Sequence, residues 1–243
     1  MKRFAQAVLL VLSGLGVLHA TLVTDLYLRY VKEGMRPLLI GSGVLLVALG
    51  VAEALSRRKA PAGDGHGHGH DHSGVPKVAW LLFLPALSLL FHAPPALGSY
   101  TASRVAPKAV AVVDQDDFDP LPATSPLPIT LRDFTQRVQQ DTGRAIEGRT
   151  VRMTGFVTPV GGGDGWYLTR IMVSCCAADA QSVKVRVYGV RAPAADTWVA
   201  VTGVWHPGGT LGTSSAEVAL DVRTVEKVER PSNSYTDALP LGE

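Results

Sequence analysis

The feature that most constrains this chain is a run of uncharged, mostly apolar residues near its N-terminus. Residues 4–23 carry no charge and follow Lys2 and Arg3. A helix of about 20 such residues is long enough to cross the roughly 30 Å hydrocarbon layer of a membrane. The alternative is a cleaved signal peptide ending near residues 18–20, but Leu18 fits poorly the small residue that a cleavage site requires. We therefore expect a retained span.

Two further apolar stretches follow, at residues 37–55 and 78–97. The first is short for a span, but the long side chains at its ends can extend towards water. Its Gly41 and Gly43 favour close packing against another helix. The second has no charge and contains internal prolines. We expect three spans, so that residues 1–98 form a transmembrane region.

Between the second and third expected spans lies a histidine-rich loop at residues 63–74. Glycine alternates there with His66, His68, His70 and His72. Such a tract cannot form a core, and its neutral imidazoles suit divalent metals such as zinc. We expect weak metal capture by these four histidines, with a solvated linker as the alternative.

The remainder of the chain changes character twice. Residues 99–129 are rich in proline and alanine and predict an extended linker. From residue 130 to residue 230 the pattern is that of a folded domain, followed by a tail at residues 231–243. Thr130 is a suitable N-cap for a short helix. Five strands are expected after it, at residues 150–157, 166–173, 183–188, 197–205 and 217–225.

Together these patterns predict a fold class. Regular short strands separated by turn signals favour a small antiparallel β-barrel, and five strands favour an OB-like one. The expected protein is membrane-anchored, with N-terminal transmembrane α-helices, then a short helix and the OB-like barrel domain.

The orientation is predicted from basic residues near the ends of the spans. With the N-terminus inside, six basic residues lie on the cytoplasmic side and five on the other. The dense cluster at residues 57–59 decides for this orientation, because cytoplasmic loops are enriched in lysine and arginine. We therefore expect a multi-pass protein of the cell membrane, in contact with the lipid bilayer, whose β domain is extracytoplasmic.

The two cysteines of the chain, Cys175 and Cys176, are adjacent and lie between two expected strands. Successive side chains of a strand point to opposite faces, so the backbone must turn here or one thiol must be buried. Three roles remain open. The pair binds a metal, with Asp179 and His206 as further ligands; it forms a strained vicinal disulfide; or both residues are small hydrophobes of the core.

Several function classes are disfavoured by the sequence. The formal net charge is only +2, and no basic block with interleaved aromatic residues is present, so we expect no nucleic-acid partner. We find no nucleophile–base–acid set, phosphate loop or pair of catalytic carboxylates. The glycine-rich run at residues 161–165 joins two expected strands and lacks the lysine of a phosphate loop. The chain is therefore not expected to be an enzyme.

Three segments resemble the bacterial YcgQ family of permease subunits. They are GRTVRMTGFV, WYLTRIMVSCCAADA and WVAVTGVW, which follow N-terminal spans and a proline-rich linker. The most specific part contains Arg170, Cys175, Cys176, Asp179 and Ala180. The resemblance implies a membrane-anchored accessory subunit that acts with a multi-span permease, YcgR, in the movement of a metal or metalloid. The alternatives are a membrane-tethered thiol redox or metal-sensing protein that acts alone, and an OB-like module that binds a ligand.

Overall fold

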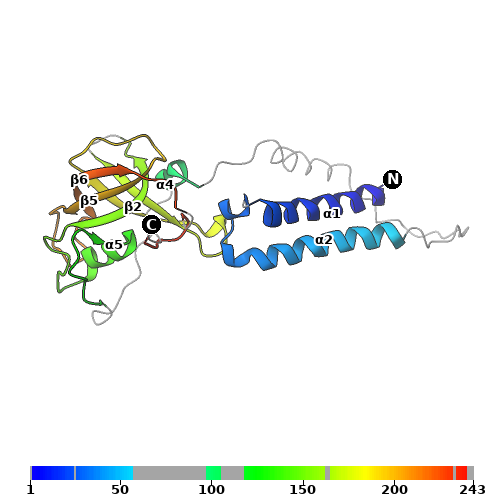
Figure 1. Cartoon of the computed structure of the whole chain (residues 1–243), viewed down its shortest axis with the longest axis horizontal. Coiled ribbons are helices and arrows are strands. Elements are labelled where there is room, and N and C mark those ends of the chain that lie inside the picture. The colour runs from blue at the N-terminus through cyan, green and yellow to red at the C-terminus, as the bar shows by residue number, and fades with distance from the viewer. Residues whose placement is uncertain are drawn as a thin grey trace, which may run out of the picture. The chain divides into compact units, whose positions relative to one another are not determined.

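The computed structural model describes the chain in two compact units (Figure 1). The helical unit comprises Met1–Arg29 and Glu33–Ala96, and the β unit comprises Tyr30–Lys32 and Leu97–Glu243. The expected histidine-rich loop lies outside the described residues, as does all but the last residue of the expected third span. The described residues are 2–24, 26–56, 97–104, 118–161, 165–231 and 234–239.

The helical unit is built on two long helices. The first, α1 (Lys2–Leu18), continues into a short π-helix, η1 (His19–Val23), and the second is α2 (Arg36–Ser56). Two windows in them, Gln6–Val23 and Glu33–Ser56, are long and apolar enough to cross a membrane. Only 17% and 11% of these windows are buried, which is unlike the core helix of a soluble protein. The two helices agree with the first two expected spans.

The two helices lie side by side because small residues let their backbones approach (Figure 1). A Cβ atom added to Gly14 would lie 2.7 Å from the carbonyl oxygen of Gly43. One added to Gly50 would lie 2.9 Å from the carbonyl oxygen of Ala7. The close packing expected of Gly43 is therefore observed, whereas a Cβ on Gly41 would meet nothing within 4 Å. Small residues at a contact are typical of helix pairs in lipid.

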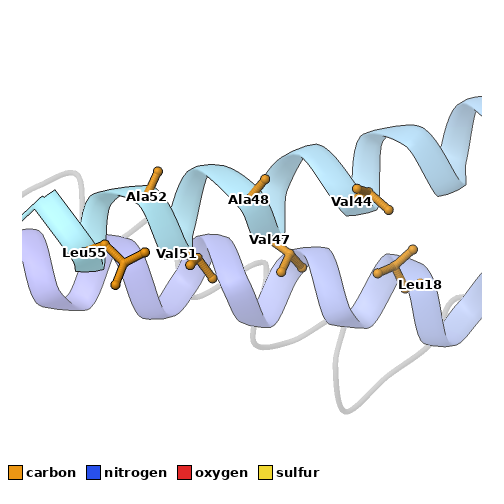
Figure 2. Close-up of a pocket in the computed structure, with 7 residues that line it drawn as sticks. All are labelled: Leu18, Val44, Val47, Ala48, Val51, Ala52 and Leu55. Atoms are coloured by element: carbon orange, nitrogen blue, oxygen red, sulfur yellow. The ribbon is translucent and has the colours of Figure 1, made fainter.

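An apolar groove of about 510 Å³ runs along the helix pair. It is lined by Leu18 of α1 and by side chains of α2 between Val44 and Leu55 (Figure 2). The side chains drawn in Figure 2 carry carbon only, so the described residues that line the groove offer van der Waals contacts and no polar side chain.

Within its described residues, the β unit has six strands and two α-helices. The short helix α4 (Ser99–Arg104) and the two-residue strand β1 (Leu127–Pro128) lie in the stretch expected to be a linker. The helix α5 (Leu131–Gln140) follows, and Thr130 caps it by accepting a hydrogen bond from the Asp133 N–H. The five longer strands are β2 (Val151–Pro159), β3 (Trp166–Met172), β4 (Gln181–Tyr188), β5 (Trp198–Trp205) and β6 (Ala219–Lys227).

These strands form one mixed sheet in the order β1-β2-β3-β4-β6-β5, with a further pairing between β2 and β5. The β1–β2 and β4–β6 pairs are parallel and the other pairs are antiparallel. The five expected strands are present, but the expected purely antiparallel arrangement is wrong, because the β1–β2 and β4–β6 pairs are parallel and the six-stranded sheet is mixed. β6 lies between β4 and β5, so these consecutive strands do not pair, and β2 pairs with both β3 and β5.

The core of the β unit lies between α5 and the inward face of the sheet. Phe134 and Val138 of α5 are fully buried, as are Trp166 and Leu168 of β3. A smaller apolar cluster joins Ala102 of α4 to the other face of β3. Both faces of β3 are therefore buried. The loop that follows β3 thus begins at the end of a rigidly held strand.

Candidate functional site

The cysteine pair lies in the loop at residues 173–180, between β3 and β4, which we call the dithiol loop. A single 3-10 turn, η7 (Ala177–Asp179), ends it. The Asp179 carboxylate accepts hydrogen bonds from the N–H groups of Ser174 and Cys175, both at 2.7 Å, and of Cys176 at 3.3 Å. One carboxylate thus gathers three consecutive amides, as capping aspartates do. The sequence expectation of a turn at the cysteines is met.

This turn places both thiols near one another. The two Sγ atoms are 3.7 Å apart, and neither cysteine is in a disulfide. Cys175 is exposed and Cys176 is half-buried, so the pair is not part of the core. One ligand atom from each of Cys175, Cys176 and Asp179 lies within 4.8 Å of the others, a grouping compatible with a shared cation.

The carboxylate also sets the acid–base behaviour of the metal-free loop. The pKa of Cys175 is raised to about 11, first by its hydrogen bond to Asp179 and then by its hydrogen bond to Cys176. The pKa of Asp179 is lowered to about 2, first by the Cys175 hydrogen bond and then by the backbone N–H groups that it accepts. At neutral pH the loop therefore holds a carboxylate beside a protonated thiol. This state does not favour nucleophilic catalysis, which uses the thiolate.

A segment from far earlier in the chain completes the site. Residues 30–32, which we call the connector, belong to the β unit although the elements on either side belong to the helical unit. Val31 forms an antiparallel bridge with Cys176. The Lys32 N–H donates to the Cys175 carbonyl at 3.0 Å, and the Ala177 N–H donates to the Tyr30 carbonyl at 2.6 Å. Nothing in the sequence around residues 30–32 indicates this contact.

Arg170, the arginine of the cysteine motif, lies in β3 and is 1% exposed. Its guanidinium lies 5.1 Å from the centre of the Trp198 ring and donates to the Ala238 carbonyl at 3.0 Å. Burial lowers its pKa, and the nearby Asp237 carboxylate opposes that shift. The same Asp237 accepts from the first amides of α5. Arg170 therefore holds the C-terminal segment against the sheet instead of facing the thiols.

The remaining expected ligands lie elsewhere. His206 follows β5, where its Nδ1 lies 2.8 Å from an Asp221 oxygen and its ring packs on Tyr188. The structure does not bring His206 into the group formed by the two cysteines and Asp179. The four histidines of residues 63–74 lie outside the described residues, and metal binding by them stays a prediction.

Comparison with known proteins adds one finding. No curated protein and no solved structure matches the chain. A family model does match residues 131–236, a range that contains α5, β2 to β6 and the dithiol loop. The description of this model names neither the YcgQ family nor a permease. Residues 131–236 of this chain therefore match the model described as the DUF1980 C-terminal domain.

Proposed function

We propose that this protein is a membrane-associated accessory subunit of a permease that binds a thiophilic divalent cation, such as zinc, through Cys175 and Cys176. The observation that carries the proposal is the 3.7 Å separation of the two Sγ atoms beside the Asp179 carboxylate. Two sulfur atoms that bind one tetrahedral zinc ion at about 2.3 Å lie about 3.8 Å apart. The thiols therefore already have the separation that chelation needs.

The alternative of a vicinal disulfide fits this geometry less well. Adjacent Cα atoms across a trans peptide lie about 3.8 Å apart. Most disulfides join Cα atoms at least about 4.4 Å apart, and shorter spans store strain. Closing the ring requires a distorted backbone, whereas chelation accepts the observed one. Chelation is also chemically complete without an oxidant, because the cation displaces the two thiol protons into water.

The donor set supports a labile site over a closed structural one. Two thiolates and one carboxylate oxygen are three ligands, and a structural zinc site has four. Asp179 also accepts three backbone hydrogen bonds, so it fixes the loop as well as adding negative charge near the cation. An exposed site with an open position suits a protein that receives a cation and releases it to a partner.

The membrane and permease parts of the proposal have different support. Membrane association is supported by two long apolar helices whose surfaces are mostly exposed and whose small residues face each other. The permease partner is supported by the resemblance of the cysteine motif to the YcgQ family. A multi-span permease that co-purifies with the tagged chain from native membranes, at constant stoichiometry, is the expected result. A chain that runs alone at native abundance would contradict the partnership.

The test of the metal site is a cysteine series in the full-length chain. The background carries His66→Ser, His68→Ser, His70→Ser and His72→Ser, so that zinc held by the tract does not contribute. Zinc affinity is measured by competition with a chromophoric chelator, and cobalt binding by its thiolate charge-transfer absorption. Cys175→Ser and Cys176→Ser should each weaken binding roughly 100-fold, nearly as much as the double substitution, because one thiolate alone does not chelate.

The matched control for this series is Ser174→Ala, which keeps the backbone N–H that Asp179 accepts and should bind zinc as the unsubstituted loop does. Single substitutions that retain most of the affinity, or a loop that shows no thiolate absorption with cobalt, would contradict the metal site.

A further inference from the structure

The connector and Asp179 hold the dithiol loop through different backbone groups. Asp179 takes up the N–H groups of residues 174–176. The connector takes up the Cys175 carbonyl and the Ala177 N–H, which belong to the two peptide groups on either side of Cys176. Both peptide planes that orient the Cys176 side chain are therefore held by residues 30–32.

This arrangement determines where the second thiol points. Cys176 has φ −154° and ψ 171°, an extended conformation that the bridge to Val31 requires. Within the loop, Asp179 holds the same residue: its carboxylate accepts from the Cys176 N–H, and its own N–H donates to the Cys176 carbonyl. Without the connector, the Cys176 backbone keeps these contacts alone, and the thiol separation is fixed less firmly. A ligand that needs that separation must then order the loop itself.

We propose that docking of the connector and binding of a cation by Cys175 and Cys176 are thermodynamically linked, so that each strengthens the other. This inference rests on the proposed function and adds regulation to the same site. Linkage is reciprocal by necessity: if the docked connector raises the affinity for the cation, the bound cation stabilises the docked connector by the same factor. The connector is a positioning segment, because it acts on the thiols through the backbone and contacts no cation.

Because of this linkage, cation binding at the thiols also affects the connector. In the chain, residues 30–32 join the 3-10 turn η2 (Leu26–Arg29) to the turn η3 (Glu33–Met35) that precedes α2. A change in cation occupancy is therefore a change in how firmly this stretch between the two apolar helices is held. A membrane partner that recognises the stretch would distinguish the loaded from the empty protein.

The first experiment compares Lys32→Pro with Lys32→Ala in the full-length, tract-substituted chain. Proline removes the N–H that donates to the Cys175 carbonyl, whereas alanine keeps it. Lys32 is exposed, so the loss of its side chain alone should matter little. We expect Lys32→Pro to weaken zinc binding about tenfold, the effect of one lost hydrogen bond. Lys32→Ala should stay within about twofold of the unsubstituted protein.

The second experiment measures hydrogen exchange with and without zinc in the protein that keeps its own Lys32. Zinc should slow exchange at the Lys32 and Ala177 amides, and the effect should vanish in the Cys175→Ser/Cys176→Ser protein. The Ser99 amide is a control within the β unit, because it donates to Asp196 and has no part in the loop.

The outcomes separate the two proposals. If the unsubstituted loop binds no zinc, both the proposed function and the linkage are wrong. If it binds zinc and Lys32→Pro binds equally well, or if zinc leaves exchange at Lys32 and Ala177 unchanged, the linkage alone is wrong. In that case the connector is a packing contact of the loop.

Discussion

The helical unit exposes many of its large hydrophobic side chains, whereas the β unit buries them. In α1 and α2, leucines face outwards: Leu12 is 60% exposed and Leu45 is 59% exposed. In the β unit, Leu168 and Phe134 are fully buried. Glycines allow the backbones of the two helices to approach closely, whereas branched and aromatic side chains fill the core of the β unit. The same residue type therefore has opposite roles in the two units.

The contrast shows that apolar composition alone does not predict whether a hydrophobic side chain is buried in a core or faces outwards. A water-soluble unit is stabilised by removing its apolar side chains from water. A helix pair in lipid gains little from burying leucine and depends on close backbone packing. Three substitution experiments test this difference, and their expected effects on unfolding run from large to negligible.

The largest effect is expected from the same substitution made once in each unit. Leu168→Ala leaves a cavity in the closed core and should lower the free energy of unfolding by about 2–5 kcal/mol. Leu45→Ala removes an outward side chain and should change it by no more than about 0.5 kcal/mol. Denaturation of the full-length protein in detergent, followed by circular dichroism, measures both. Comparable losses at the two positions would show that the units are built alike.

A smaller effect is expected from two glycines of α1. Alanine at Gly14 places a methyl group 2.7 Å from the Gly43 carbonyl oxygen, so Gly14→Ala should cost about 1–3 kcal/mol by forcing the helices apart. Gly16 has nothing within 4 Å of an added Cβ. Gly16→Ala should therefore be neutral or stabilise the helix by up to about 1 kcal/mol. Thermal unfolding of the helical signal measures the pair, and equal behaviour would refute the close contact.

The dithiol loop is part of neither the helix contact nor the core of the sheet, and a substitution in it should change the reactivity of Cys175 with only a small shift of the unfolding midpoint. Asp179→Asn removes the carboxylate whose hydrogen bond with the Cys175 thiol is the main cause that raises the Cys175 pKa to about 11, so that pKa should fall towards the ordinary value of 9.0. More thiolate is then present at pH 8, and alkylation of Cys175 should be faster by up to about 100-fold.

The pH dependence of this effect has a definite sign. Asp179 has a pKa of about 2, so its charge persists throughout the titration of the thiol, and the hydrogen bonds that it accepts are lost only as the pH falls through that value. Alkylation of the unsubstituted protein should keep rising beyond pH 9, whereas the Asp179→Asn rate should level off earlier. Glu147→Gln, an exposed change of the same kind, is the control. Unchanged kinetics in Asp179→Asn would contradict the hydrogen bond to Cys175.

The sequence predicts the local elements of the β unit well and their pairing poorly. The alternation of Val183, Val185 and Val187 predicts β4, and the placement of Leu131, Phe134 and Val138 on one face of a helix predicts α5. The parallel pairing of β4 with β6 is missed, because periodicity reports which face of a strand is buried and not which strand lies beside it. The strand β1 is missed because it has only two residues and one is proline.

At the candidate site, the sequence predicts the two cysteines and Asp179 but misses the connector that holds their loop. Adjacent cysteines and a nearby aspartate are visible as a motif, because all of them lie within one short loop. His206 is predicted as a ligand from its place at a strand end, but the structure pairs it with Asp221. The connector is missed for a physical reason: it contributes backbone atoms, which every residue has, so no side-chain pattern marks it.

The bridge between Val31 and Cys176 also bears on membrane topology. Backbone hydrogen bonds do not join two segments through a bilayer, so the connector and the dithiol loop share one side of any membrane that the helices cross.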